Sequence, residues 1–131
     1  MFTQPCFIRK NTPELRKKLE ELGYVSHIFN NNDANNIYAD KLGTYISVDI
    51  ENQPYYIDCE TNEELFLALA ALRDDTDINQ YFVCDKVSFT LGKTYYPDDY
   101  LYYQYDEFFD KQNWHKATVK EIIEHFKNKK L

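Results

Sequence analysis

Glycine and proline are scarce in this sequence of 131 residues, which holds three glycines and four prolines. A phosphate-binding loop needs several glycines close together, because its backbone must approach the phosphate groups closely. Gly23, Gly43 and Gly92 each stand alone, so the composition argues against Gly-rich nucleotide-binding loops. Signatures of serine hydrolases, P-loop proteins and kinases are also missing. We therefore expect no cofactor, and we favour a protein that is not an enzyme.

Cysteine is scarce too, and its pattern indicates a reducing compartment. Cys6, Cys59 and Cys84 form no C-x-x-C motif, and three cysteines cannot all pair within one chain. We expect three free thiols. The start of the sequence lacks the charged and apolar regions of a signal peptide, and the longest apolar stretch, 65–72, is too short to span a membrane. These absences predict a cytoplasmic protein without membrane contact.

Cys59 is the one cysteine whose position suggests reactivity, because it directly precedes a predicted helix. A helix N-terminus lowers the pKa of a nearby thiol. Asp58 and Glu60 flank Cys59 and oppose the formation of a thiolate. We therefore favour a structural, half-buried thiol over a nucleophile.

Motifs for metal binding are incomplete. The segment 75–79, Asp-Thr-Asp-Ile-Asn, begins like an EF-hand calcium loop. Gln80 then stands where that loop needs glycine, and Lys86 stands where it needs a bidentate glutamate. The histidines at 27, 115 and 125 do not have the i, i+4 spacing of a zinc-binding helix. We expect no metal site, with calcium at this turn as the less favoured alternative.

Positive charge is scarce overall and uneven along the chain. The formal net charge is −7, and the sequence pI is about 4.9. Residues 74–110 carry nine acidic and two basic residues, while residues 111–131 carry two acidic and six basic residues. Nucleic-acid binding over a broad surface needs a basic footprint, which the chain as a whole lacks. We expect no direct nucleic-acid binding, and the acidic middle favours a basic protein partner.

Three helices are predicted, each from a threonine at its start. Thr12 suits an N-cap with Pro13 at the first helical position, and Gly23 suits the end of that helix. The second helix, about 61–73, begins with a capping box at Thr61 and is apolar on all sides, which indicates a buried central helix. The third begins with the capping box of Thr118 and Glu121.

The intervening segments are rich in β-branched and aromatic residues, which favours strands. We expect strands at 6–9, 25–29, 44–49, 54–58, 80–84, 87–91 and 100–105. The asparagine-rich segment 30–36 is predicted to be a loop, and 51–53 a hairpin connection. Neighbouring strands of this kind predict an α+β fold, with three helices and a mostly antiparallel sheet of five to seven strands. The length predicts one domain over residues 1–131.

The segment 95–110 is the most unusual part of the sequence, with six tyrosines, two phenylalanines, five acidic residues and no basic residue. Exposed tyrosines supply large contact areas in protein interfaces, and carboxylates among them prefer a basic partner. The alternative, given equal weight, is that these rings only cover a sheet edge. The predicted partner-binding residues are Tyr95, Tyr96, Asp98, Asp99, Tyr100, Tyr102, Tyr103, Tyr105 and Asp106.

Two other functions remain open on the sequence alone. A pocket for a small ligand or nucleotide would use the cations and the imidazole near the ends of predicted elements. Its candidate residues are Arg9, Lys10, His27 and Arg73. The chain could also be a structural subunit of a larger assembly, and self-association is compatible with either reading.

Three stretches, 6–24, 65–83 and 114–126, resemble short uncharacterised proteins of bacteriophages and prophages. The matching features are Phe7-Ile8-Arg9-Lys10-Asn11-Thr12-Pro13-Glu14-Leu15 and Trp114-His115-Lys116-Ala117-Thr118. The resemblance covers about half of the chain and includes no catalytic motif. It implies a small accessory protein that acts by stoichiometric binding, as do phage proteins that inhibit host defences or mimic the charge of nucleic acid.

Overall fold

The computed structural model describes residues 1–27, 30–50, 53–86, 88–91, 93–97, 99–105, 109–110 and 112–128. Within these residues the chain forms an α+β fold with three helices, as the sequence predicts, and ten strands, where five to seven were expected. The helices are α1 (Pro13–Leu22), α2 (Glu63–Ala70) and α3 (Val119–Asn128). The strands divide into separate sheets of five, three and two strands rather than forming one sheet.

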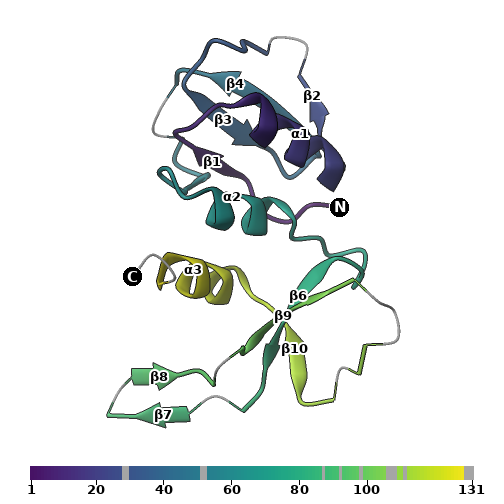
Figure 1. Ribbon diagram of the computed structural model, residues 1–131, viewed down its shortest axis with the longest axis vertical. Coiled ribbons are helices and arrows are strands. Elements are labelled where there is room, and N and C mark those ends of the chain that lie inside the picture. The colour runs from purple at the N-terminus through teal and green to yellow at the C-terminus, as the bar shows by residue number, and fades with distance from the viewer. Residues whose placement is uncertain are drawn as a thin grey trace.

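The N-terminal half contains the five-stranded sheet, with the order β2-β4-β3-β1-β5. Its strands are β1 (Cys6–Ile8), β2 (Val25–Ser26), β3 (Asn36–Ala39), β4 (Thr44–Val48) and β5 (Ile57–Asp58). The pairs β1–β3 and β3–β4 are antiparallel, whereas β1–β5 and β2–β4 are parallel. Figure 1 shows α1 beside this sheet, and α2 between the sheet and α3.

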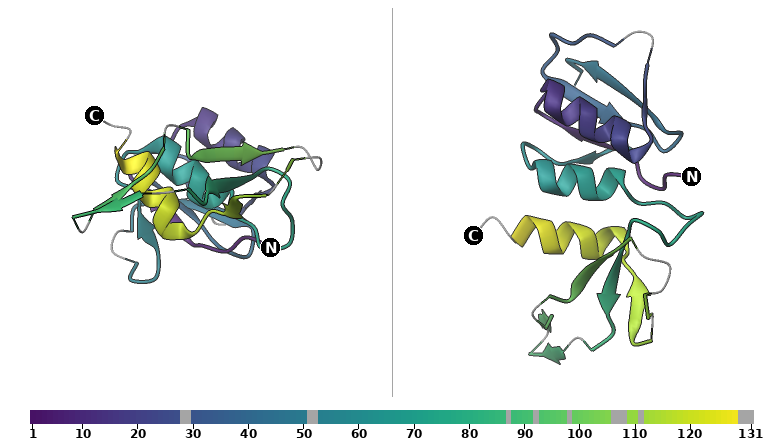
Figure 2. Two further views of the ribbon diagram at one scale, coloured as in Figure 1. Left: turned by 90° about the horizontal axis from the view of Figure 1, so that it is seen from below. Right: turned by 45° about the vertical axis from the view of Figure 1, so that its right-hand side comes forward.

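The C-terminal half contains the two smaller sheets. The three-stranded sheet has the order β10-β6-β9, and the other pairs β7 with β8. Their bounds are β6 (Gln80–Cys84), β7 (Ser88–Thr90), β8 (Lys93–Tyr95), β9 (Leu101–Gln104) and β10 (Trp114–Lys116). All of their strand pairs are antiparallel. Figure 2 shows α3 between α2 and these sheets, so the two helices form the middle of an elongated molecule.

The helix ends follow from local chemistry. Thr12 accepts a hydrogen bond from the Leu15 N–H at 3.1 Å, and Gly23, with φ of 111°, closes α1 in the left-handed conformation. Thr118 and Glu121 form the reciprocal capping box at α3. These two predictions are confirmed.

The N-cap of α2 differs from the prediction. Asn62, not Thr61, caps the helix, because its side-chain oxygen accepts a hydrogen bond from the Leu65 N–H at 3.2 Å. The Asn62 amide also donates to the Phe126 carbonyl oxygen at 3.3 Å. The cap therefore joins α2 to α3, and this second contact explains why asparagine is used there.

Two strand predictions in the N-terminal half were wrong. Ile57 and its neighbour pair with β1 in parallel, so the segment after residue 53 does not form a hairpin with β4. Asn36, predicted to lie in a loop, begins β3 and is only 2% exposed. Its side-chain amide donates to the Ile50 carbonyl oxygen at 3.0 Å, which compensates for the burial of a polar group.

The hydrophobic core is continuous between the two halves and is centred on α2. Leu65, Phe66, Ala68, Leu69 and Ala70 are all buried, which confirms the predicted central helix. They belong to one cluster that includes side chains of the five-stranded sheet, β6 and α3. None of the described helices is both long enough and apolar enough to cross a lipid bilayer.

Cys59 belongs to this core. It is 1% exposed and Cys6 is fully buried, and both thiols are free. Burial and the neighbouring Cys59 thiol raise the pKa of Cys6 well above its usual value. Cys6 is therefore held as a neutral thiol, and its Sγ lies 3.8 Å from the Phe66 carbonyl oxygen of α2. Burial keeps Cys59 from acting as an exposed nucleophile.

Candidate functional site

The Tyr-rich segment 95–110 divides into an inward and an outward part. Tyr96 and Tyr100 turn inward, with ring centroids 4.1 Å apart, and the Tyr96 hydroxyl donates to Glu124 of α3 at 3.0 Å. Burial and this carboxylate raise the pKa of Tyr96 to about 12. Tyr96 is half-buried and Tyr100 is only 9% exposed, so the Tyr100 ring, a predicted partner contact, offers little surface to a partner.

The backbone explains why Tyr100 and Tyr102, two residues apart, lie on different faces. β9 begins only at Leu101, and the preceding Asp99 has a φ of 56°, in the left-handed region. Strand alternation therefore does not extend back to Tyr100. Its ring lies 5.0 Å from that of His125 on α3, whereas Tyr102 lies on the opposite face of the sheet.

The outward part is built on the face of the three-stranded sheet that turns away from α3. Tyr102 is 43% exposed and stacks on Phe109, with centroids 4.6 Å apart. Trp114 lies edge-on to both rings, at 6.0 and 5.9 Å, and Phe82 lies beneath Phe109 at 5.4 Å. These four side chains are called the aromatic face below.

Strand pairing brings the aromatic face together. Phe82 of β6 is directly opposite Tyr102 of β9, and Trp114 of β10 is opposite Cys84 of β6. Sequence reasoning selected Tyr102 but missed Phe82, Phe109 and Trp114. Phe82 and Trp114 belong to other strands, which only the pairing of the sheet brings next to β9. The alternation of Phe82 and Cys84 within 80–84 was the available signal, since residues two apart share a face.

Exposed polar groups also lie outside the aromatic face, at Tyr105, Asp99 and Asp110. Tyr105 is 67% exposed, and its ring lies 5.9 Å from that of Tyr103. Asp99 and Asp110 are both exposed. Asp98 and Asp106, also predicted to bind a partner, lie outside the described residues. Tyr95 ends β8, and its side chain likewise lies outside the description.

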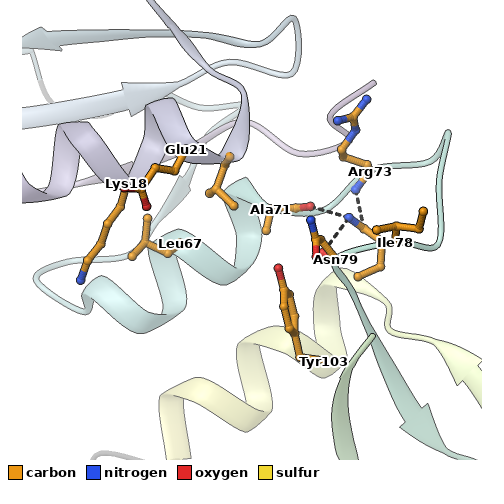
Figure 3. Close-up of a pocket in the computed structure, with 10 residues that line it drawn as sticks. Lys18, Glu21, Leu67, Ala71, Arg73, Ile78, Asn79 and Tyr103 are labelled. Carbon is orange, nitrogen blue, oxygen red and sulfur yellow. Dashed lines mark hydrogen bonds between the residues drawn. The ribbon is translucent and has the colours of Figure 1, made fainter. Parts of the chain in front are cut away.

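A cleft of about 540 Å³ opens on the other side of β9. Leu22 of α1, Leu67 and Ala71 of α2 and Tyr103 of β9 supply its apolar lining, and Lys18 lies at its border. Figure 3 shows the Tyr103 hydroxyl directed into this space. Partial burial raises the pKa of Tyr103. Glu21, Asn79 and Gln80 also line it, so the cleft combines an apolar wall and a neutral phenol with polar groups.

The Arg73 side chain turns away from this cleft, as Figure 3 shows. Its guanidinium forms two hydrogen bonds with Asp75, at 2.9 and 2.8 Å, and lies 5.2 Å from the centre of the Phe2 ring. The hydrogen bond to Asp75 raises the pKa of Arg73, and the same contact lowers that of Asp75. The guanidinium is thus already occupied by an anion.

The four cationic candidates for a ligand pocket do not come together. Arg9 pairs with Asp58 at 2.8 Å and Lys10 with Glu63 at 2.6 Å, both near the start of α2. Arg73 follows the end of that helix. His27 directly follows β2 and is exposed, and its backbone N–H donates to the Tyr45 carbonyl oxygen. This arrangement gives no support to a phosphate pocket made of these four residues.

His115 joins two parts of the C-terminal half. Its Nδ1 contacts Asp85 after β6, and its Nε2 lies 2.8 Å from Glu121 in the first turn of α3. Partial burial lowers the pKa of His115, but the hydrogen bonds to Asp85 and Glu121 outweigh this, so its pKa lies above the usual 6.5. Within the described part of the chain, no cluster of three or more potential ligands could hold a metal ion.

The raised pKa of His115 predicts a pH-dependent contribution to stability. Protonated His115 can donate to both carboxylates, so this contribution is complete below the unfolded pKa of about 6.5 and disappears as the pH rises through the folded pKa. We expect His115→Gln to destabilise the protein more at about pH 5.5 than at about pH 9. Urea unfolding of both proteins at both pH values measures this. An equal difference at the two pH values would contradict it.

No protein-family model, curated protein or solved structure matches this chain.

Proposed function

We propose that the protein is a non-enzymatic binding module that holds a basic protein partner against the aromatic face and Tyr105. The observation that carries this proposal is the cluster of the partly exposed rings of Tyr102, Phe109 and Trp114 on a sheet face that turns away from α3, the helix that packs on the other face. Tyrosine and tryptophan give large contact areas at low entropic cost, and they dominate the energy of many interfaces. In this role the protein acts stoichiometrically, by covering a surface of its partner.

Charge supports a basic partner. The segment 74–110, which contains β6 and β9, has a net charge of −7. Lysine or arginine of a partner can approach the carboxylates and also lie over the exposed rings, where cation–π attraction adds to the contact. Single-stranded nucleic acid also stacks on aromatic side chains, but it needs cations along its backbone, which this segment does not supply.

The proposal is tested by affinity capture from a native lysate of the source cells, using the immobilised protein and two of its variants. Replacing both Tyr102 and Tyr105 with threonine should abolish capture of the partner, because it removes the two most exposed rings of the surface. The matched control is Tyr55→Thr, since Tyr55 is an 85% exposed tyrosine far along the chain from β9. The control should capture the partner as the original protein does.

The readout is the amount of each captured protein, determined by quantitative mass spectrometry, with melting temperatures confirming that the variants remain folded. A captured protein supports the proposal if it is basic, if the double variant fails to capture it and if salt releases it. Capture that survives the double variant, or that is lost equally with Tyr55→Thr, would refute the assignment of this surface.

A further inference from the structure

The outer edge of β9 offers backbone hydrogen-bonding groups to a partner. β9 pairs with β6 alone among the described strands, so it is an edge strand. The Ala117 N–H donates to the Tyr81 carbonyl oxygen at 2.9 Å, so the backbone groups of Tyr81 point toward β10, and Tyr81 and Tyr103 form a non-hydrogen-bonded pair of the β6–β9 ladder. Tyr102 and Gln104 therefore direct their N–H and C=O groups toward β6. By the same alternation, those of Leu101 and Tyr103 point outward, away from β6.

Two different surfaces flank this edge. Tyr102 lies on the aromatic face, while the adjacent Tyr103 lies on the opposite face and lines the cleft with Leu22 and Leu67. A strand added along β9 would continue both faces, because side chains alternate along every strand of a sheet. Every second residue of the added strand would lie beside Tyr102, and the residues between them beside Tyr103.

We propose that the partner contributes an extended segment that adds to the edge of β9, with lysine or arginine alternating with apolar residues. This rests on the proposed function. Charge selects the cationic residues, because the segment 74–110 carries nine acidic residues, of which Asp99, before β9 in the sequence, and Asp110, after it, are exposed. The apolar wall of the cleft favours the apolar residues, since Leu22, Leu67 and Tyr103 are partly exposed there. Backbone hydrogen bonds to Leu101 and Tyr103 hold the segment in place.

The probe is a fluorescent synthetic peptide of alternating lysine and valine, eight residues long, added to the full chain at low salt. We expect saturable binding, with amide hydrogen exchange slowed at Leu101 and Tyr103, the two positions whose N–H groups face outward. A peptide of alternating glutamate and valine should not bind, because its charge is repelled. Absence of lysine–valine binding, or binding without slowed exchange at these two amides, would overturn the strand-addition proposal.

A pair of substitutions at one position separates the backbone contact from the side chain. Tyr103→Ala removes the ring but keeps the N–H, whereas Tyr103→Pro removes both. Proline is tolerated here because this N–H does not bond to β6. We expect at least a tenfold weaker affinity for the peptide with proline than with alanine, a difference of about 1.4 kcal/mol. Equal affinities would overturn the proposal, provided that both variants melt near the same temperature.

These outcomes differ from a failure of the proposed function. If partner capture depends on Tyr102 and Tyr105 but the two Tyr103 variants capture equally, the binding module stands and strand addition is wrong. If capture does not depend on Tyr102 and Tyr105, the proposed function itself is wrong.

Discussion

Replacing Phe66 with alanine is expected to lower the free energy of unfolding by about 3–5 kcal/mol. Phe66 lies in the middle of α2 and is fully buried in the cluster that joins the two halves of the molecule. Truncation to alanine removes most of its apolar surface and leaves a cavity that the surrounding helices and strands can fill only in part. Since a domain is stabilised by only about 5–15 kcal/mol, this change removes a large share of the total.

Urea unfolding followed by circular dichroism measures the effect, and the neighbouring residue provides a matched control. Leu67 is on the same helix but faces the cleft and is only half-buried, so Leu67→Ala should cost about 1–2 kcal/mol. Both substitutions place alanine in α2 and neither lowers helix propensity. A loss for Phe66→Ala no larger than that for Leu67→Ala would contradict the central position of α2.

Local signals explain which parts of this fold were predictable from sequence. The ends of α1 depend on contacts within a few residues, such as that between Thr12 and Leu15, so they could be predicted accurately. The buried character of α2 follows from a continuous apolar run. The N-cap at Asn62 was missed because its choice depends on Phe126, a residue 64 positions away, which no local rule includes.

Strand pairing was not accessible from local patterns. β5 follows β4 in the chain and a hairpin was the simplest connection, but the Ile57 N–H donates to the Pro5 carbonyl oxygen, 52 residues earlier. Burial also overrides intrinsic preference at Asn36, whose residue type favours loops. The division into several sheets depends on these distant pairings, which explains why one sheet was expected and three are found.

The candidate site was predictable in composition but not in orientation. The concentration of tyrosines and carboxylates in 95–110 identifies an unusual segment. Whether a given ring points inward depends on where β9 begins and on the left-handed backbone at Asp99, which together bury Tyr100 and leave Tyr102 outward. The contribution of Trp114 depends on the pairing of β10 with β6. Only the fold places these rings together.

Replacing the two paired glutamines of β6 and β9 with methionine, one at a time, is expected to have opposite effects on the free energy of unfolding. Gln80 and Gln104 face each other in the register, and both side chains are buried. The Gln80 side chain accepts a hydrogen bond from the backbone N–H of Arg73 at 2.7 Å and donates one to the Ala71 carbonyl oxygen at 2.8 Å. Gln104 Oε1 is buried without a hydrogen-bond partner among the described residues.

Gln80→Met should therefore lower the free energy of unfolding by about 2–3 kcal/mol, because it leaves the Arg73 N–H and the Ala71 carbonyl without their partner. Gln104→Met should leave stability unchanged or raise it by about 1 kcal/mol, since it replaces an unsatisfied buried oxygen with an apolar group of similar size. The two variants share the host strand pair and the new residue, so each controls for the other. Denaturant midpoints at unchanged slope measure both effects. A loss at Gln104 as large as that at Gln80 would show that the Gln104 amide also has a structural partner.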